Sequence, residues 1–212
     1  MNRLKIKVCG MKEPDNISRL ARLKPDMMGF VFYPSSPRFA GSSPAPGMFE
    51  KFPAGIIKTG VFVDEDQYSI NAQVLRFGLH AVQLHGDESP EICKQLQSSG
   101  IQVIKAFRIN EETNFSKMMK YVSFCKWFLF DTASSLPGGS GERFNWNLLG
   151  NYKLGHPFFL SGGIGPSDAE QILLLNHVSL AGVDINSRFE TEPGVKNLDS
   201  VERFITKIRN GI

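Results

Sequence analysis

The sequence predicts a single α/β domain, residues 1–212, folded as a (β/α)8 TIM barrel. Two observations predict this class. Short apolar runs recur along the chain, each followed by a turn and a helical pattern, which is the alternation typical of a parallel sheet. The chain has 212 residues, slightly fewer than the roughly 250 that are typical of such barrels. One sizeable hydrophobic core is therefore expected.

Eight apolar runs are expected to form the strands. They cover residues 4–9, 27–32, 56–63, 79–84, 102–107, 127–131, 158–161 and 180–185. The helices between them have readable starts: Glu13-Pro14-Asp15 begins the first and Ser89-Pro90-Glu91 the fourth. The last expected helix carries a one-sided apolar stripe at spacings of three and four, which should close the ring: Leu198, Val201, Phe204, Ile205 and Ile208.

A doubly wound open sheet is the alternative for this alternating pattern. A dinucleotide-binding sheet of that kind would show G-x-G-x-x-G after the first strand. Here the first strand ends in Cys9-Gly10-Met11, so that fingerprint is missing. The barrel is therefore favoured, and in a barrel the active site lies at the carboxyl ends of the strands.

The seventh apolar run leads into a glycine-rich turn, Ser161-Gly162-Gly163, and Pro166 is expected at the first position of the next helix. Glycines let the backbone approach a ligand, and the free N–H groups at a helix start favour an anion, most often phosphate. A plain turn between strand and helix explains this segment equally well. The eighth run decides between them, because it ends in Asn186-Ser187, beside the place where barrels bind phosphate.

Composition argues against several classes of protein. The formal net charge is +3, with Lys and Arg scattered among Asp and Glu, so no nucleic-acid partner is expected. No apolar run reaches the roughly 18 residues that span a bilayer, so we expect no membrane association and a cytoplasmic location. The cysteines are odd in number and lack CxxC spacing, which argues against a disulfide framework or a zinc site: Cys9, Cys93 and Cys125.

Two strand-end residues could transfer protons. Cys9 and Asp131 end the first and sixth strands, which places them on different sides of one pocket mouth. A general acid on one side of a small substrate and a general base on the other are what a proton-shuttling isomerase requires. Positive neighbours would favour the thiolate of Cys9. On spacing alone, a small core residue is the better interpretation of this cysteine.

Other polar residues are expected at the same face. Arg38 suits a carboxylate or an aromatic ring, although a loop arginine is more often simply solvated. His85 follows Gln83 at the end of the fourth strand, but the other histidines fall at the opposite end of the barrel, so no metal site is expected. Asp184 either supports the site or accepts backbone hydrogen bonds at its strand end. The Gly- and Ser-rich loop 132–143 is either a lid or a plain flexible loop.

Several motifs occur in order along the chain: Lys7-Val8-Cys9-Gly10, Ser36-Pro37-Arg38, Gln83-Leu84-His85-Gly86, Phe130-Asp131-Thr132, Gly138-Gly139-Ser140-Gly141 with Phe144 and Trp146, Ser161-Gly162-Gly163-Ile164, and Asp184-Ile185-Asn186-Ser187 followed by Glu192-Pro193-Gly194. With them the chain resembles the phosphoribosylanthranilate isomerase family, from the first strand to the last helix. The S-G-G-I motif occurs in several phosphate-binding barrels. The first-strand K-x-C-G, together with Q-L-H-G and the sixth-strand F-D-T, is specific to this family.

The resemblance implies an Amadori rearrangement of N-(5-phospho-β-D-ribosyl)anthranilate, a step of tryptophan biosynthesis that needs no cofactor and no metal. The product is 1-(2-carboxyphenylamino)-1-deoxy-D-ribulose 5-phosphate. By the same resemblance Asp131 is the general acid, Cys9 the general base and Arg38 the residue that holds the anthranilate. The other residues matched to the family are Gln83, His85 and Asp184 for the substrate, and Gly139, Gly141, Gly162, Gly163, Asn186 and Ser187 for its phosphate. A monomer or homodimer is expected.

Two departures from the family pattern stand out. Arg188 replaces the glycine that commonly follows the serine of the eighth strand end, and it either adds charge near the phosphate or points outward. Glu142-Arg143 replaces a small residue and Lys in the sixth loop.

Rival functions lack their residues. A pentose-phosphate epimerase would need histidines and carboxylates around a metal, and a synthase acting later in the same pathway a Lys and Glu pair; neither set is visible. A non-catalytic phosphate-binding barrel remains the alternative from another class, but it has no use for Cys9 opposite Asp131.

Overall fold

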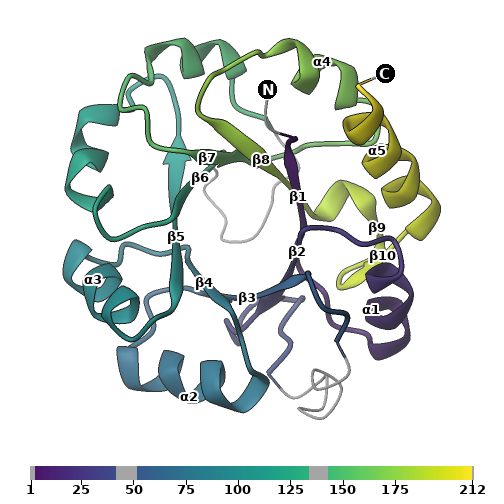
Figure 1. Cartoon of the computed structure of the whole chain (residues 1–212), viewed down its shortest axis with the longest axis horizontal. Helices are drawn as coiled ribbons and strands as arrows, with labels where there is room; N and C mark the ends of the chain where they lie inside the picture. The colour runs from purple at the N-terminus through teal and green to yellow at the C-terminus, as the bar shows by residue number, and fades with distance from the viewer. Residues whose placement is uncertain (1–2, 42–51, 134–142, 212) are drawn as a thin grey trace.

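Eight parallel strands form a closed barrel in which each strand pairs with its neighbours in sequence order and β1 pairs with β8. The computed structural model describes residues 3–41, 52–133 and 143–211. The barrel strands are β1 Lys5–Val8, β2 Met27–Val31, β3 Ile57–Phe62, β4 Ala81–Leu84, β5 Gln102–Ile109, β6 Trp127–Thr132, β7 Phe158–Leu160 and β8 Leu180–Ile185. Figure 1 shows the strands as an inner ring with the helices outside it. The predicted barrel and all eight predicted strands are confirmed, with small shifts at their ends.

The connections are α-helices or shorter 3₁₀ helices. The α-helices are α1 Pro14–Ala21, α2 Gln67–Phe77, α3 Pro90–Ser98, α4 Ala169–Leu174 and α5 Leu198–Asn210. The 3₁₀ helices are η2 Phe115–Tyr121, η3 Trp146–Asn151 and η4 Ser187–Phe189. The helical patterns after β5 and β6 are thus 3₁₀ turns, in which backbone N–H groups bond three residues back, as from Lys117 to Asn114 at 3.2 Å. A short antiparallel ribbon, β9 Glu190–Glu192 and β10 Val195–Lys196, follows β8.

The predicted helix starts are confirmed at two places and wrong at a third. Glu13 caps α1 by accepting from the next two backbone N–H groups, and Ser89 precedes α3. After β7, however, α4 begins at Ala169 and not at Pro166. The Asp168 carboxylate accepts from the Gly165 N–H at 2.7 Å, which folds residues 165–168 into a turn before the helix begins.

Alternate strand positions face two different layers. Ile6, Val8 and Phe30 belong to the large core between the strands and the helices, to which α5 contributes its predicted stripe. Cys9 belongs instead to a small cluster inside the barrel, with Val31. Because side chains alternate along a strand, Lys7 shares the inward face with Cys9. No helix among the described residues is long and apolar enough to cross a membrane.

Candidate active site

The carboxyl ends of the strands bring most of the predicted polar residues to one face of the barrel. Asp131 lies at the end of β6, one residue before Thr132. Its Oδ2 lies 3.1 Å from Nε2 of His85, and its Oδ1 accepts from the Thr132 N–H at 2.9 Å. The amide nitrogen of Gln83 lies 2.7 Å from Nδ1 of His85. Because an amide nitrogen can only donate, Nδ1 accepts, and the ring proton on Nε2 points at Asp131. The structure therefore brings Gln83, His85 and Asp131 together in one chain of hydrogen bonds.

Cys9 lies at the end of β1, almost fully buried, with its backbone N–H bonded to the carbonyl of Ile185 at 2.9 Å. Gly29 on the neighbouring strand makes room for it, because a Cβ at Gly29 would lie 2.6 Å from the sulfur. Two residues earlier on the same face, Lys7 donates to Oδ2 of Asp184 at 2.9 Å. Lys7 pairs in register with Asp184 across β1 and β8, and both side chains are buried. A buried ion pair therefore lies directly below the cysteine.

The charges of this pair act on the thiol in opposite directions. Burial raises the pKa of the Cys9 thiol, the positive charge of Lys7 lowers it, and the Asp184 carboxylate raises it. The net pKa lies above the ordinary value, so burial outweighs the favourable cation. Burial also raises the pKa of Asp184, and Lys7 only partly offsets this. The expected positive neighbour of Cys9 is present, but the free thiol stays protonated at neutral pH.

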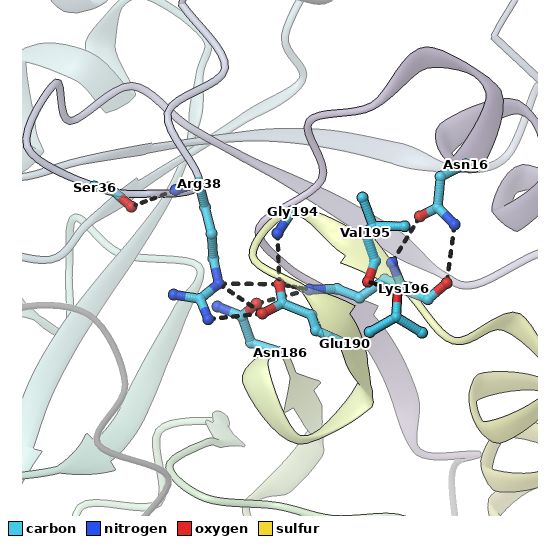
Figure 2. Close-up of polar contacts among 9 residues, drawn as sticks. Asn16, Ser36, Arg38, Asn186, Glu190, Gly194, Val195 and Lys196 are labelled. Carbon is cyan, nitrogen blue, oxygen red and sulfur yellow. Dashed lines mark hydrogen bonds and ion pairs between the residues drawn. The ribbon is translucent and has the colours of Figure 1, made fainter.

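Arg38 lies in a polar network with the β9–β10 ribbon, shown in Figure 2. Its Nε donates to both carboxylate oxygens of Glu190 at 2.9 and 3.0 Å, and its Nη2 donates to one of them at 2.7 Å. Lys196 donates to Glu190 at 2.5 Å and to Oδ1 of Asn186 at 2.8 Å. The Arg38 side chain is only 9% exposed, so the interpretation as a solvated loop arginine is wrong. The Asn186 side chain is joined to this network.

Burial and charge act on the two other ionised groups of this network. Burial alone would raise the pKa of the Glu190 carboxyl, but its bonds to Arg38 and the charge of Lys196 bring it below the ordinary value. Burial lowers the pKa of Lys196 to about 8, although Glu190 opposes the change.

The glycine turn after β7 has the backbone that its sequence predicts. Gly162 and Gly163 have φ of +83° and +63°, a region that favours glycine. A Cβ at Gly162 would also lie 2.3 Å from Oγ1 of Thr132, so the turn packs closely against the end of β6. The exposed Arg188 lies next to this turn, since a Cβ at Gly165 would be 3.4 Å from its Cδ. Arg188 is therefore a cation beside the predicted anion site.

Some predictions could not be placed, and some residues of the site were missed. Gly139 and Gly141, and the central part of loop 132–143, lie outside the described residues. Three residues that contact the predicted ones have no role that the sequence pattern indicates: Lys7, Glu190 and Lys196. A lysine between two buried apolar residues of a strand, Ile6 and Val8, was the available signal for the first of them. The described residues contain no group of His, Cys, Asp and Glu that could hold a metal.

Comparison with known proteins decides the family. The family model described as N-(5'phosphoribosyl)anthranilate (PRA) isomerase matches residues 6–207. The chain belongs to the phosphoribosylanthranilate isomerase family. One relative, the N-(5'-phosphoribosyl)anthranilate isomerase of Phocaeicola vulgatus, is 43% identical over 207 residues, covering 98% of both chains. That of Parabacteroides distasonis is 44% identical, covering 96% of this chain and 92% of the relative.

Solved phosphoribosylanthranilate isomerases have the same fold. The crystal structure of the enzyme from Thermotoga maritima superposes with a TM-score of 0.85 at 31% identity, covering 99% of this chain and all of the other. Another solved phosphoribosylanthranilate isomerase, in complex with reduced 1-(o-carboxyphenylamino)-1-deoxyribulose 5-phosphate, superposes with a TM-score of 0.82 at 30% identity. That protein binds a phosphorylated small molecule that carries a carboxyphenyl group.

Proposed function

We propose that the chain isomerises N-(5-phosphoribosyl)anthranilate in tryptophan biosynthesis, with Asp131 as general acid and Cys9 as general base. The family supplies the reaction, and one observation supports the assignment of roles. Cys9 and Asp131 stand at the ends of β1 and β6, on different sides of the barrel mouth, and each has a charged or polar partner of its own: Lys7 for the thiol and His85 for the carboxyl. A small substrate between them would meet one proton donor and one proton acceptor.

The first step opens the ribose ring. Asp131 gives its proton to the ring oxygen, the bond from C1′ to that oxygen breaks, and the anilino nitrogen supplies the electron pair of the resulting iminium. Asp131 is left as a carboxylate, to which Nε2–H of His85 donates. In the second step the Cys9 thiolate removes the C2′ proton, and the electrons of that bond form the enolamine and neutralise the iminium. Tautomerisation to the ketone completes the isomerisation without net loss of atoms or electrons.

The thiolate is needed only at the second step. The free thiol has a raised pKa because it is buried, so ionisation requires a favourable charge beyond that of Lys7. The iminium formed in the first step is such a charge, because its carbon is bonded to C2′, which carries the proton that Cys9 removes. The thiol releases its own proton to solvent when it ionises, and Asp131 takes up a proton from solvent after the reaction, so both groups return to their starting forms. The thiol of this enzyme should therefore ionise more readily in the complex than in the free protein.

Substrate binding is proposed to use both ends of the pocket. Arg38 would bind the anthranilate carboxylate, and the backbone at Gly162, Gly163, Asn186 and Ser187 would bind the phosphate, with Arg188 adding positive charge nearby. Among the described residues, Oε1 of Gln83 and Oδ1 of Asp184 are buried without a hydrogen-bond donor. Such acceptors suit the ribose hydroxyl groups, because a buried acceptor left unpaired is costly.

We further propose that the enzyme is cytoplasmic, has one domain per chain and acts as a monomer or homodimer. The alternative of a non-catalytic phosphate-binding barrel would leave the buried pair beneath Cys9 without a purpose. A turnover assay that follows the fluorescence of the anthranilate substrate separates the two. Turnover without added metal or cofactor supports the isomerase, and binding of the substrate without any turnover would reject it.

A further inference from the structure

The β9–β10 ribbon buries ionised groups that no step of the proposed reaction uses. The Glu190 side chain is 5% exposed and that of Lys196 is fully buried. Burial of an ion costs free energy, and well-packed apolar residues usually stabilise a fold at least as well as a buried ion pair does. The presence of this pair at the mouth of the barrel therefore calls for a reason other than stability.

The contacts form a chain of supports that ends at Arg38 (Figure 2). Asn16 of α1 fixes the backbone of Lys196 with two hydrogen bonds, at 2.9 Å to its carbonyl and 2.8 Å from its N–H. Lys196 donates to Glu190, which also accepts from the Gly194 N–H at 3.2 Å. Glu190 in turn holds Arg38 through three short contacts. Asn16, Lys196 and Glu190 lie on α1, β10 and β9, and Gly194 lies in the turn between the two strands of the ribbon.

Among the described residues, the contacts of the Arg38 guanidinium leave one of its edges available. Its guanidinium contacts to Glu190 all use the Nε and Nη2 edge. The planar group has a second edge, formed by Nη1 and Nη2, that can bind another carboxylate with two parallel hydrogen bonds. Arg38 also passes close to Gly10, the residue after Cys9, because a Cβ at Gly10 would lie 2.7 Å from its Cδ. Two cations and one anion leave a net charge of +1 in the cluster, which favours an anionic ligand.

We propose that Glu190, braced by Lys196, is a positioning residue that fixes Arg38 so that its second edge meets the substrate carboxylate. This inference rests on the proposed function of Arg38. Glu190 itself does not touch the substrate. Glu190 restricts the rotation of the long Arg38 side chain before the substrate binds. The free energy of binding is then not reduced by the conformational entropy lost when Arg38 becomes ordered.

A mutant cycle on the whole enzyme tests this role. The variants are Glu190→Gln, Arg38→Met and the double variant, and Glu192→Gln serves as the matched control, because Glu192 is an exposed glutamate on the same strand. Steady-state kcat and KM are measured with the anthranilate substrate. We expect Glu190→Gln to raise KM about tenfold and to change kcat by less than about threefold, because the lost contact serves ground state and transition state alike. In the Arg38→Met background the same change should alter KM by less than about twofold.

The outcomes separate the inference from the proposed function. If the wild-type enzyme shows no turnover, the proposed function fails. If it turns over but Arg38→Met leaves KM unchanged, the role of Arg38 fails, and the inference fails with it. If Arg38→Met raises KM but Glu190→Gln behaves like Glu192→Gln, or raises KM equally with and without Arg38, only the inference is overturned. Should Glu190→Gln not fold, Lys196→Met replaces it in the same cycle, with the same requirement that its effect on KM depends on Arg38.

Discussion

Removal of the Lys7 charge should leave a smaller fraction of Cys9 in the thiolate form that acts as the base. An opposite charge within a few ångströms typically lowers the pKa of an acid by about 1 to 3 units, so Lys7→Met should raise the pKa of the thiol by an amount in this range. Asp184 then loses its partner and takes up a proton, which also removes a charge that disfavours the thiolate. The two effects partly cancel, so we expect the low end of the range. At neutral pH this corresponds to about tenfold less thiolate and about tenfold lower kcat, or roughly 1.4 kcal/mol of barrier.

The pH dependence distinguishes this effect from a general loss of structure. Because the thiol is mostly protonated, kcat should rise with pH in both proteins, and the Lys7→Met curve should be shifted to higher pH. The assay is the loss of substrate fluorescence from about pH 6 to pH 9, together with the rate at which iodoacetamide alkylates Cys9. Lys5→Met is the matched control, since Lys5 lies two residues before Lys7 on the same strand. An unshifted curve in Lys7→Met, equal to that of Lys5→Met, would refute the reasoning.

Three further predictions follow from the site. Asp131→Asn should lower kcat by about 10² to 10⁴ with KM nearly unchanged, as expected for a proton donor that acts in the transition state, and steady-state kinetics will show whether KM rises instead. Gly163→Val should raise KM strongly because its φ of +63° excludes a β-branched residue, and binding of a product analogue should weaken in parallel unless the turn is not the phosphate site. The pKa of Glu190 is lowered in the folded protein, so its contribution to stability is present above the ordinary pKa of 4.5 and is lost as the pH falls through the folded pKa. Urea unfolding should therefore show Glu190→Gln less stable than the wild type at neutral pH, with the difference in unfolding free energy shrinking in acid. A difference that does not change with pH would contradict this.

The sequence predicted the barrel because buried parallel strands leave a strong apolar signal. Each of the eight runs became a strand, and the stripe on α5 packs as expected. The start of α4 was not predictable in the same way. Pro166 is a common first helical residue, but the Asp168 side chain completes a turn first, and a side-chain bond of this kind leaves no periodic pattern.

The residues that were missed depend on register across the barrel. Lys7 and Asp184 are 177 positions apart and meet only because β1 pairs with β8. Arg38 and Glu190 are 152 positions apart and meet because the ribbon after β8 lies against the segment after β1, where the Lys12 N–H donates to the Gly194 carbonyl. Residue type and spacing along the chain carry no information on such pairs. Strand ends therefore indicated the proposed reacting groups, Cys9 and Asp131, but not the residues that contact the predicted ones from distant strands.

The charges around the pocket suggest why the two proton transfers occur in the proposed order. Before ring opening, with Asp131 and Cys9 both protonated, the buried ion pairs around the pocket contain three cations, Lys7, Arg38 and Lys196, and two anions, Asp184 and Glu190. When Asp131 gives up its proton, the protein gains one negative charge, and the substrate gains one positive charge at the iminium. The iminium offsets the negative charge of the Cys9 thiolate until that thiolate takes the C2′ proton, and both charges then disappear together. Ring opening and C2′ deprotonation therefore support each other electrostatically, and a buried thiol of raised pKa can serve as the base.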